Sequence, residues 1–395
     1  MFEKKKDFLI NLGANLHSCG ASADEVEEFT QSLSKKLDIE TSLLCTPNFM
    51  MYSFKYNDSE SFYIEKLPFP IIHLKKLVLI ETLIKEFLDK KISLEDIISK
   101  LKIIRKLKLN TSYPALILSY GLLSCSSCIF LGGTLKDCLV SFFLGCFTGL
   151  FSLLEFFPIV SIFYQAIISF FMTTMIFLLQ KYFIVINPGI ISIASLIGLF
   201  PGLGITLSVT ELAKQHLLSG IMRLMNAITT LLMLVFGSFL ATNFFKISFF
   251  NPKYILHPIS LQLLFALIAG LASNRIFRGR YQDIPIMIVS CLLSFASSKL
   301  LPFNTFLNIF CTGIFISFYS QIFSIIFKRP YLVCILPSIL LLLPGTLSFK
   351  ITNDLFVGNF QGVMEQGVLL FLTLSSLVFG LLVGQFFTIL KKYVQ

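Results

Sequence analysis

The stretch LFPGLGITLSVTE, residues 199–211, recurs in related form as LLPGTLSFKITND, residues 342–354. Each copy carries a Pro-Gly pair inside a run of apolar residues, and an acid follows each pair at the same distance. Equivalent residues lie 143 positions apart: Pro201 and Gly202 with Pro344 and Gly345, Glu211 with Asp354, and Gly237 with Gly380. Proline interrupts a helix, and inside a bilayer an interrupted helix is tolerated where its backbone lines a cavity or a binding site. Two such segments in corresponding positions are typical of secondary transporters.

The composition is that of an integral membrane protein. Apolar residues make up 55% of the chain and charged residues 14%, and the mean hydropathy is +0.82, whereas soluble domains carry roughly 25% charged residues. Residues 1–112 hold 17 of the 32 Lys and Arg and 16 of the 22 Asp and Glu, which leaves 15 basic and six acidic residues for the remainder. Such a basic excess is expected from loops on the cytoplasmic side, so the net charge of +10 predicts a membrane protein and no nucleic-acid partner.

Residues 1–112 predict a cytoplasmic α+β domain. The expected helices are Leu9–His17, Ala23–Leu37, Leu74–Asp89 and Leu94–Leu107, and the expected strands are Ile39–Cys45, Phe49–Tyr56 and Phe62–Lys66. No signal peptide is visible in residues 1–12, so we expect the amino terminus to stay in the cytoplasm. A basic cluster before the first apolar run also indicates the cytoplasmic face: Lys102, Arg105, Lys106 and Lys108.

The remainder predicts a polytopic α-helical membrane protein with about ten transmembrane helices. Apolar runs of about 20 residues are long enough to cross a bilayer. The ten runs are 114–133, 137–155, 157–180, 184–209, 217–243, 257–276, 283–300, 304–327, 331–350 and 366–390. We expect two five-helix repeats, at 113–250 and 251–395.

The odd number of spans in each repeat has a geometric consequence. The second copy must enter the membrane upside down relative to the first, which gives two inverted repeats with both termini in the cytoplasm. Glu211 then approaches a central site from the cytoplasmic side and Asp354 from the outer side. The basic loop at residues 275–280 falls on the cytoplasmic side and is interpreted as a topology signal.

The candidate site residues are polar groups within the apolar region. A carboxylate at bilayer depth costs several kcal/mol unless it is paired, hydrated or protonated. Of the six acids that follow Thr111, Glu211 and Asp354 share a repeat position, and they are interpreted as proton or gate carboxylates or, alternatively, as helix caps at the membrane surface. Arg223, one helical face on from Ser219 and Gly220, is a candidate for binding a substrate carboxylate; the alternatives are an interfacial arginine or an ion pair with Glu211. The other four acids are Asp137, Glu155, Asp283 and Glu365.

No cofactor, metal site or enzymatic activity is predicted. The chain carries no phosphate-binding glycine motif and no zinc-protease motif, and its nine cysteines are irregularly spaced and mostly lie in apolar runs. A nucleophile near His17, Cys19 and Cys45 is conceivable, but nothing in the sequence fixes its geometry.

The segment Leu12–Phe54 resembles the start of the bacterial threonine/serine exporter (ThrE-like) family, in its fused two-repeat form. The family's recurring residues match Gly20, Ala21, Val26, Glu27, Thr46 and Pro47. Its membrane pattern of Pro-Gly, an acid about ten residues on, then Ser-Gly and Arg matches Pro201, Gly202, Glu211, Ser219, Gly220 and Arg223. The resemblance spans essentially the whole chain, with Glu211 where the family has Asp, and with Gly362 and Gln366 at the second-repeat positions of Ser219 and Arg223.

This resemblance implies proton-coupled export of threonine and serine across the bacterial inner membrane. The expected partners are a small-molecule substrate, protons and membrane lipid, and a homo-oligomer is compatible with this interpretation. Two alternatives stay open: an exporter of a dicarboxylate such as succinate, and a membrane-anchored regulatory or enzymatic module. Ten spans argue against the last, because one span would suffice to anchor a domain.

Overall fold

The computed structural model describes residues 2–56, 59–107, 112–153, 163–182, 186–245, 255–342 and 344–394. Parts of the predicted spans, at 154–155, 157–162, 184–185 and 343, lie outside the described residues, as does the predicted repeat boundary at 250–251.

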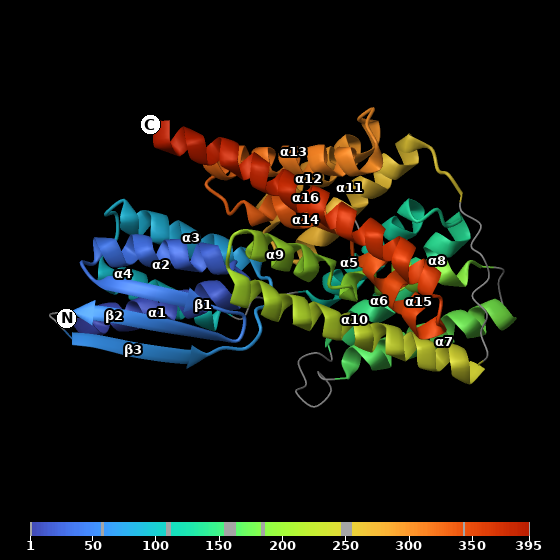
Figure 1. The fold of residues 1–395 in the computed structure, drawn as a ribbon, viewed down its shortest axis with the longest axis horizontal. Helices are drawn as coiled ribbons and strands as arrows, with labels where there is room; N and C mark the ends of the chain where they lie inside the picture. The colour runs from blue at the N-terminus through green and yellow to red at the C-terminus, as the bar shows by residue number, and fades with distance from the viewer. Residues whose placement is uncertain are drawn as a thin grey trace.

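The N-terminal unit combines a small sheet with four helices (Figure 1). Its elements are α1 (Phe2–Ser18), α2 (Ala23–Lys36), β1 (Glu40–Cys45), β2 (Phe49–Tyr56), β3 (Ser59–Lys66), α3 (Leu74–Leu88) and α4 (Leu94–Lys106). The strands form an antiparallel sheet in the order β1-β2-β3, with Glu40 opposite Lys55. The predicted elements are therefore present, and α1 begins seven residues before the expected position.

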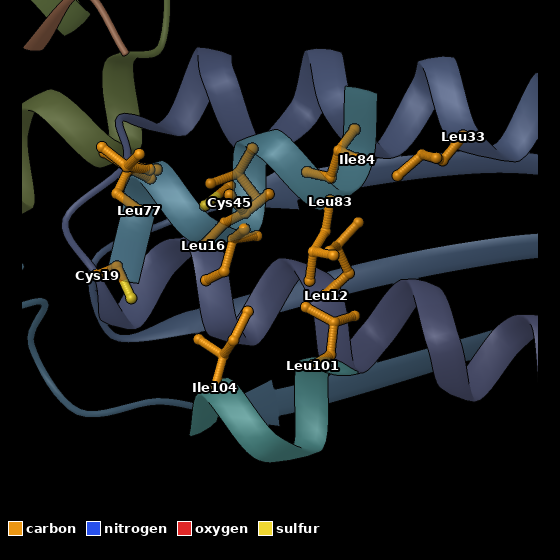
Figure 2. Packing of buried hydrophobic residues seen from close by; sticks show 14 of the residues in the cluster. Leu12, Leu16, Cys19, Leu33, Cys45, Leu77, Leu83, Ile84, Leu101 and Ile104 are labelled. Atoms are coloured by element: carbon orange, nitrogen blue, oxygen red, sulfur yellow. The ribbon is translucent and has the colours of Figure 1, made fainter. Parts of the chain in front are cut away.

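The core of this unit follows from its apolar periodicity. Alternate residues of β2, Met50, Tyr52 and Phe54, are buried, as expected where one face of a strand is covered. Figure 2 shows Leu12 of α1 between Leu83 of α3 and Leu101 of α4. The same buried cluster continues into the helical part of the chain through Phe277, Met287 and Val333, among others. The N-terminal unit is thus packed against the helices that follow it.

Twelve α-helices make up the rest of the described chain. They are α5 (Tyr113–Phe130), α6 (Leu135–Phe151), α7 (Tyr164–Tyr182), α8 (Pro188–Leu196), α9 (Gly202–Ala213), α10 (Leu217–Phe245), α11 (Ile259–Ile276), α12 (Ile284–Leu300), α13 (Thr305–Phe327), α14 (Leu332–Leu342), α15 (Pro344–Val357) and α16 (Phe360–Val394). Short 3₁₀ turns, η2 (Ile197–Leu199) and η3 (Tyr281–Asp283), precede α9 and α12.

These helices are those of a membrane protein. Within the described residues, five are long and apolar enough to cross a bilayer, and two bent pairs raise the number to seven. Large apolar side chains are exposed on their outer faces, such as Phe143 of α6 and Phe371 of α16, as expected for contact with lipid. A helix or a bent pair lies in each of the ten predicted ranges, and α5 begins where the first repeat is expected to begin. The total of ten spans and the division into domains stay predictions.

Both Pro-Gly pairs lie at bends. Pro201 precedes α9, and α8–η2 meets α9 at 57°. Pro344 begins α15, and Leu332–Leu342 meets Thr346–Asp354 at 40°. Near these bends, α9 packs against α15, and the rings of Phe200 and Phe349 stack with their centroids 4.8 Å apart. The two broken helices therefore meet inside the helical part.

Equivalent helices pack in equivalent ways. A Cβ on Gly237 of α10 would collide with the carbonyl oxygen of Ala166 in α7, and a Cβ on Gly380 of α16 would collide with that of Phe310 in α13. The missing side chain at Gly237 thus lets α10 touch the backbone of α7, and the missing side chain at Gly380 lets α16 touch the backbone of α13. In Figure 1, α10 begins beside the N-terminal unit and runs away from it, whereas α16 begins at the far end and runs back. Opposite directions are what two inverted copies would produce.

Candidate functional site

Glu211, Ser219 and Arg223 form a buried ion-pair site between the end of α9 and the start of α10. Arg223 Nη2 donates to Glu211 Oε1 at 2.9 Å, and Arg223 Nε donates to Glu211 Oε2 at 3.1 Å. Ser219 Oγ donates to the same Oε2 at 2.9 Å. Glu211 is 2% exposed and Arg223 9% exposed, so this two-pronged pair is screened from solvent.

The sequence places these three groups together by simple helix geometry. Ser219 and Arg223 are four residues apart and therefore share one face of α10. Gly220 lets that face approach α9, because a Cβ there would lie 2.6 Å from Leu212 Cγ and 2.9 Å from the Ser208 carbonyl oxygen. Among the alternatives for Arg223, the structure shows the ion pair with Glu211.

The N-terminal unit covers this site with the first turn of α2. The backbone N–H of Ala23 points to Glu211 Oε1 at 3.5 Å. Beside it, Lys214 Nζ donates to Asp24 Oδ2 at 2.7 Å. Burial opposes the charge of Asp24, but the nearby Lys214 holds the pKa of that carboxyl below its usual value. The positive end of the α2 dipole and the Asp24–Lys214 pair thus join the two parts of the chain at Glu211.

His17 of α1 lies under the same site. Its side chain is 2% exposed, and neither ring nitrogen has a hydrogen-bond partner among the described residues. Burial and then the charge of Arg223 lower the pKa of His17 to about 4, so the imidazole is neutral at pH 7. Burial raises the pKa of the nearby Cys19 thiol to about 11, which keeps the thiol protonated and gives no support to a cysteine nucleophile here.

A cavity of about 570 Å³ lies beside the Asp24–Lys214 pair. Its walls come from α2, the end of α9, α13, α16 and the start of α14, and its charged lining residues are Asp24, Glu25, Glu28 and Lys214. Burial and then Asp24 raise the pKa of Glu25 to about 7. We call this space the acidic vestibule. Its charged side chains suit a ligand that is positively charged or zwitterionic.

Asp354 lies apart from the ion-pair site. It sits near the end of α15, which Figure 1 places at the end of the molecule remote from the N-terminal unit. Asn359 Nδ2 is 3.4 Å from Asp354 Oδ1, and a Cβ on Gly362 would lie 2.6 Å from Oδ2. Glu211 and Ser219 thus correspond to Asp354 and Gly362, but Gln366 replaces the arginine. Within the described residues Asp354 makes no ion pair.

The other predicted site residues have structural positions. Pro201 is the N-cap of α9 and Gly202 its first residue, about 14 Å along the helix axis from Glu211 at 1.5 Å per residue; Pro344 and Gly345 begin α15. Both pairs lie at the bends. Asp137, at the start of α6, accepts hydrogen bonds from Thr134 and Asn187. Asp283 forms an ion pair with Arg329 at 3.6 Å. Glu365 accepts a hydrogen bond from Gln361 on the surface, and Glu155 lies outside the described residues.

Sequence reasoning missed the contribution of the N-terminal unit. Asp24 and His17 lie beside the site although they are almost 200 positions from Glu211 in the sequence. No local sequence pattern predicts a contact over that separation. The acidic first turn of α2 and the lone Lys214 on the other side were the available signals, and both are weak. No group of three or more His, Cys, Asp or Glu with metal-binding geometry occurs in the part of the chain that the structure describes.

Two family models match the chain in succession. The first, described as "Putative threonine/serine exporter", matches residues 7–245, which is more than half of the chain. The second, described as "Threonine/Serine exporter, ThrE", matches residues 262–387. No curated protein and no solved structure matches.

Proposed function

Because the chain belongs to the threonine/serine exporter family, we propose that it carries threonine and serine out of the cytoplasm in exchange for protons. In this proposal the ion-pair site is the gate on the cytoplasmic side of the bacterial inner membrane. The broken helices α8–α9 and α14–α15 supply the moving parts for alternating access. The observation that carries the proposal is the buried, two-pronged pair between Glu211 and Arg223, covered by α2.

A free amino acid is a zwitterion, and its two charges complement the two members of this pair. Its carboxylate can take the place of Glu211 on the Arg223 guanidinium, while its ammonium takes the place of Arg223 on the Glu211 carboxylate. Binding then exchanges one internal ion pair for two external ones and leaves the net charge of the site unchanged. A buried site tolerates that exchange because no charge is left without a partner.

Ser219 adds a reason for a hydroxy amino acid. Its hydroxyl lies 2.9 Å from Glu211 Oε2 and can accept as well as donate a hydrogen bond. When the ammonium of the substrate occupies Glu211, the Ser219 hydroxyl is free to pair with the β-hydroxyl of threonine or serine. A site that pairs a hydroxyl rejects an analogue that lacks it, such as valine for threonine.

Protonation of Glu211 provides the coupling. A neutral carboxyl group binds an ammonium far more weakly than a carboxylate does, so a proton and the substrate compete for the same oxygen atoms. Competition for one site is what proton antiport requires, because each direction of the cycle then carries one of the two. Asp354 is the corresponding acid for the outer side. Its lack of an arginine partner favours release of the amino acid carboxylate there.

The acidic vestibule argues against succinate as the substrate. A dicarboxylate carries two negative charges, and the ion-pair site offers it a single guanidinium beside the carboxylate of Glu211. On the way in it would meet three acids, Asp24, Glu25 and Glu28, with Lys214 as the counter-charge. A zwitterion meets no such barrier, since its ammonium is attracted by the same side chains.

The test is transport into and out of proteoliposomes that contain the full chain. We expect counterflow of labelled threonine and serine that depends on a pH gradient, no counterflow of labelled succinate, and loss of threonine transport in Glu211→Gln and Arg223→Gln. Glu365→Gln serves as the matched control, because it makes the same change at an exposed acid. Succinate transport without threonine transport would refute the proposal.

A further inference from the structure

A second cavity, of about 330 Å³, lies where the N-terminal unit meets the loop between α11 and α12. It is formed by the start of α3, the start of α5 and the residues that follow α11. Its lining residues include Lys75, Arg275, Arg278 and Arg280, and none of the described residues that line it is acidic. The nearby acid Asp283 is held by Arg329, with 3.6 Å between Oδ1 and Nε. We call this space the basic cavity.

One ring nitrogen of a buried imidazole in the wall of the basic cavity lacks a hydrogen-bond partner among the described residues. His73 is 9% exposed, and its Nδ1 has no hydrogen-bond partner among the described residues. Burial, and then the charges of Arg278, Lys76 and Lys75, lower the pKa of His73 to about 4. An anion in the cavity would offset the positive charges that surround this ring.

Backbone and side-chain hydrogen bonds hold the walls of the basic cavity in place. The N–H groups of Leu74 and Lys75 at the start of α3 donate to the carbonyl oxygens of Phe277 and Arg278, at 3.0 and 3.1 Å. The buried Asn274 donates from Nδ2 to the Arg280 carbonyl oxygen at 3.0 Å. Arg278 itself has φ of 52°, a left-handed conformation that costs about 1–2 kcal/mol in a non-glycine residue. This conformation ends α11, because the N–H groups of Arg278 and Gly279 donate to the carbonyl oxygens of Arg275 and Asn274 at 3.1 and 2.7 Å.

The position of the basic cavity indicates the level of lipid headgroups. In its wall, Ser112 is the N-cap of α5 and Leu116 lies in the first turn of this helix, which is long and apolar enough to span a membrane. Tyr113 is 56% exposed and Tyr281 69% exposed beside it, as aromatic side chains are at the membrane interface. Arginine binds phosphate with two parallel hydrogen bonds, and basic pockets beside membrane helices are suited to phosphate headgroups.

We propose that the basic cavity is a phosphate-binding site, occupied by the headgroup of an acidic phospholipid or by free phosphate. Arg275 is held against the ring of Tyr281, with 3.7 Å between the guanidinium carbon and the ring centroid. Lys75, Arg278 and Arg280 supply further positive charge. The site joins the N-terminal unit to the membrane helices and does not depend on the transported substrate.

The experiment titrates purified full-length protein in a neutral detergent and follows its Tm. The three probes are dihexanoyl phosphatidylglycerol, dihexanoyl phosphatidylcholine and inorganic phosphate. We expect phosphatidylglycerol to raise the Tm, and Arg278→Gln/Arg280→Gln to weaken the apparent Kd about 25-fold, at roughly fivefold for each basic side chain. Lys75→Gln gives a second, milder variant should the double variant fold poorly. The double variant Lys35→Gln/Lys100→Gln removes the same charge from exposed positions and is the control.

Each outcome decides the proposal. Stabilisation by phosphatidylglycerol alone, lost in the variants, identifies a lipid headgroup. Stabilisation by inorganic phosphate, lost in the same variants, identifies free phosphate. Equal stabilisation of wild type and cavity variants, equal loss in the control, or no stabilisation by any probe would overturn the proposal.

Discussion

Neutralising one member of the Glu211–Arg223 pair tests whether that pair is a gate or only a structural brace. Glu211→Gln leaves the Arg223 side chain, 10% exposed, without its counter-charge. Removing one partner of a buried ion pair costs about 3–5 kcal/mol. At about 2.1 cal/mol/K per residue, the unfolding entropy of the 395-residue chain converts this to a fall in Tm of about 4–6 °C. Arg223→Gln should cost a similar amount, because it leaves Glu211 buried and unpaired.

The double variant Glu211→Gln/Arg223→Gln separates the two roles. With both charges gone, two neutral amides and Ser219 can still form hydrogen bonds, so we expect a net loss of only about 1–2 kcal/mol. Stability should thus recover relative to either single variant, with a coupling of at least about 4 kcal/mol. Threonine transport should not recover, since neither substrate charge finds its partner.

The assay is Tm in detergent together with counterflow of labelled threonine in proteoliposomes, on all four forms of the protein. A structural brace would show transport that returns with stability. Native transport by the double variant would therefore refute the role of the pair in binding. Additive losses of Tm would show that the two side chains are not coupled in the folded protein.

Three further measurements address the packing, the pH response and the topology. Gly237→Ala should lower the stability by about 1–3 kcal/mol, seen as a lower Tm, because its Cβ meets the α7 backbone, whereas Gly189→Ala, with nothing within 4 Å, should be neutral; equal Tm values for the two variants would contradict this packing. Folding raises the pKa of Glu25 from 4.5 to about 7, so protonation of this carboxyl favours the folded state. Raising the pH from 4.5 to 7 should therefore lower the stability of the wild type by up to about 3 kcal/mol relative to Glu25→Gln, as measured by Tm at each pH. Parallel pH curves for the two proteins would count against this assignment. Cysteines introduced at Lys214 and Gln361 should react with an impermeant maleimide from opposite faces of the membrane, and labelling from one face would exclude inverted repeats.

Much of the fold could be predicted because its signals are local. Apolar run length located the helices, Pro201 and Pro344 located the bends, and alternation located β2 with its buried Met50, Tyr52 and Phe54. The start of α1 was placed too late, because the lysines at 4–6 conceal a helix whose other face packs Phe8 and Leu9 into the core. Charge-rich sequence and a buried face are compatible in an amphipathic helix.

The candidate site could be predicted only in part. The spacing of Ser219 and Arg223 and the repeat position of Glu211 singled out three residues that the structure brings into contact, and the ion pair was one of the alternatives. The covering of that pair by Ala23 depends on a contact across 188 residues, which no single-sequence pattern encodes. The roles proposed for Asp354 and for the Pro-Gly pairs stay predictions, because the structure shows Asp354 apart from Glu211 and the Pro-Gly pairs at bends, but neither in contact with a substrate.

The backbone contacts at Gly237 and Gly380 have a mechanical consequence. At these contacts backbone packs directly on backbone, without side chains in between. We therefore expect α10 with α7, and α16 with α13, to form two rigid helix pairs. Compliance is then concentrated in two joints, the 57° and 40° bends. If the proposed transport cycle moves these bends, stiff helix pairs on either side would limit how far the pathway opens. Amino acids larger than threonine should then be transported more slowly, even though their backbone charges are the same.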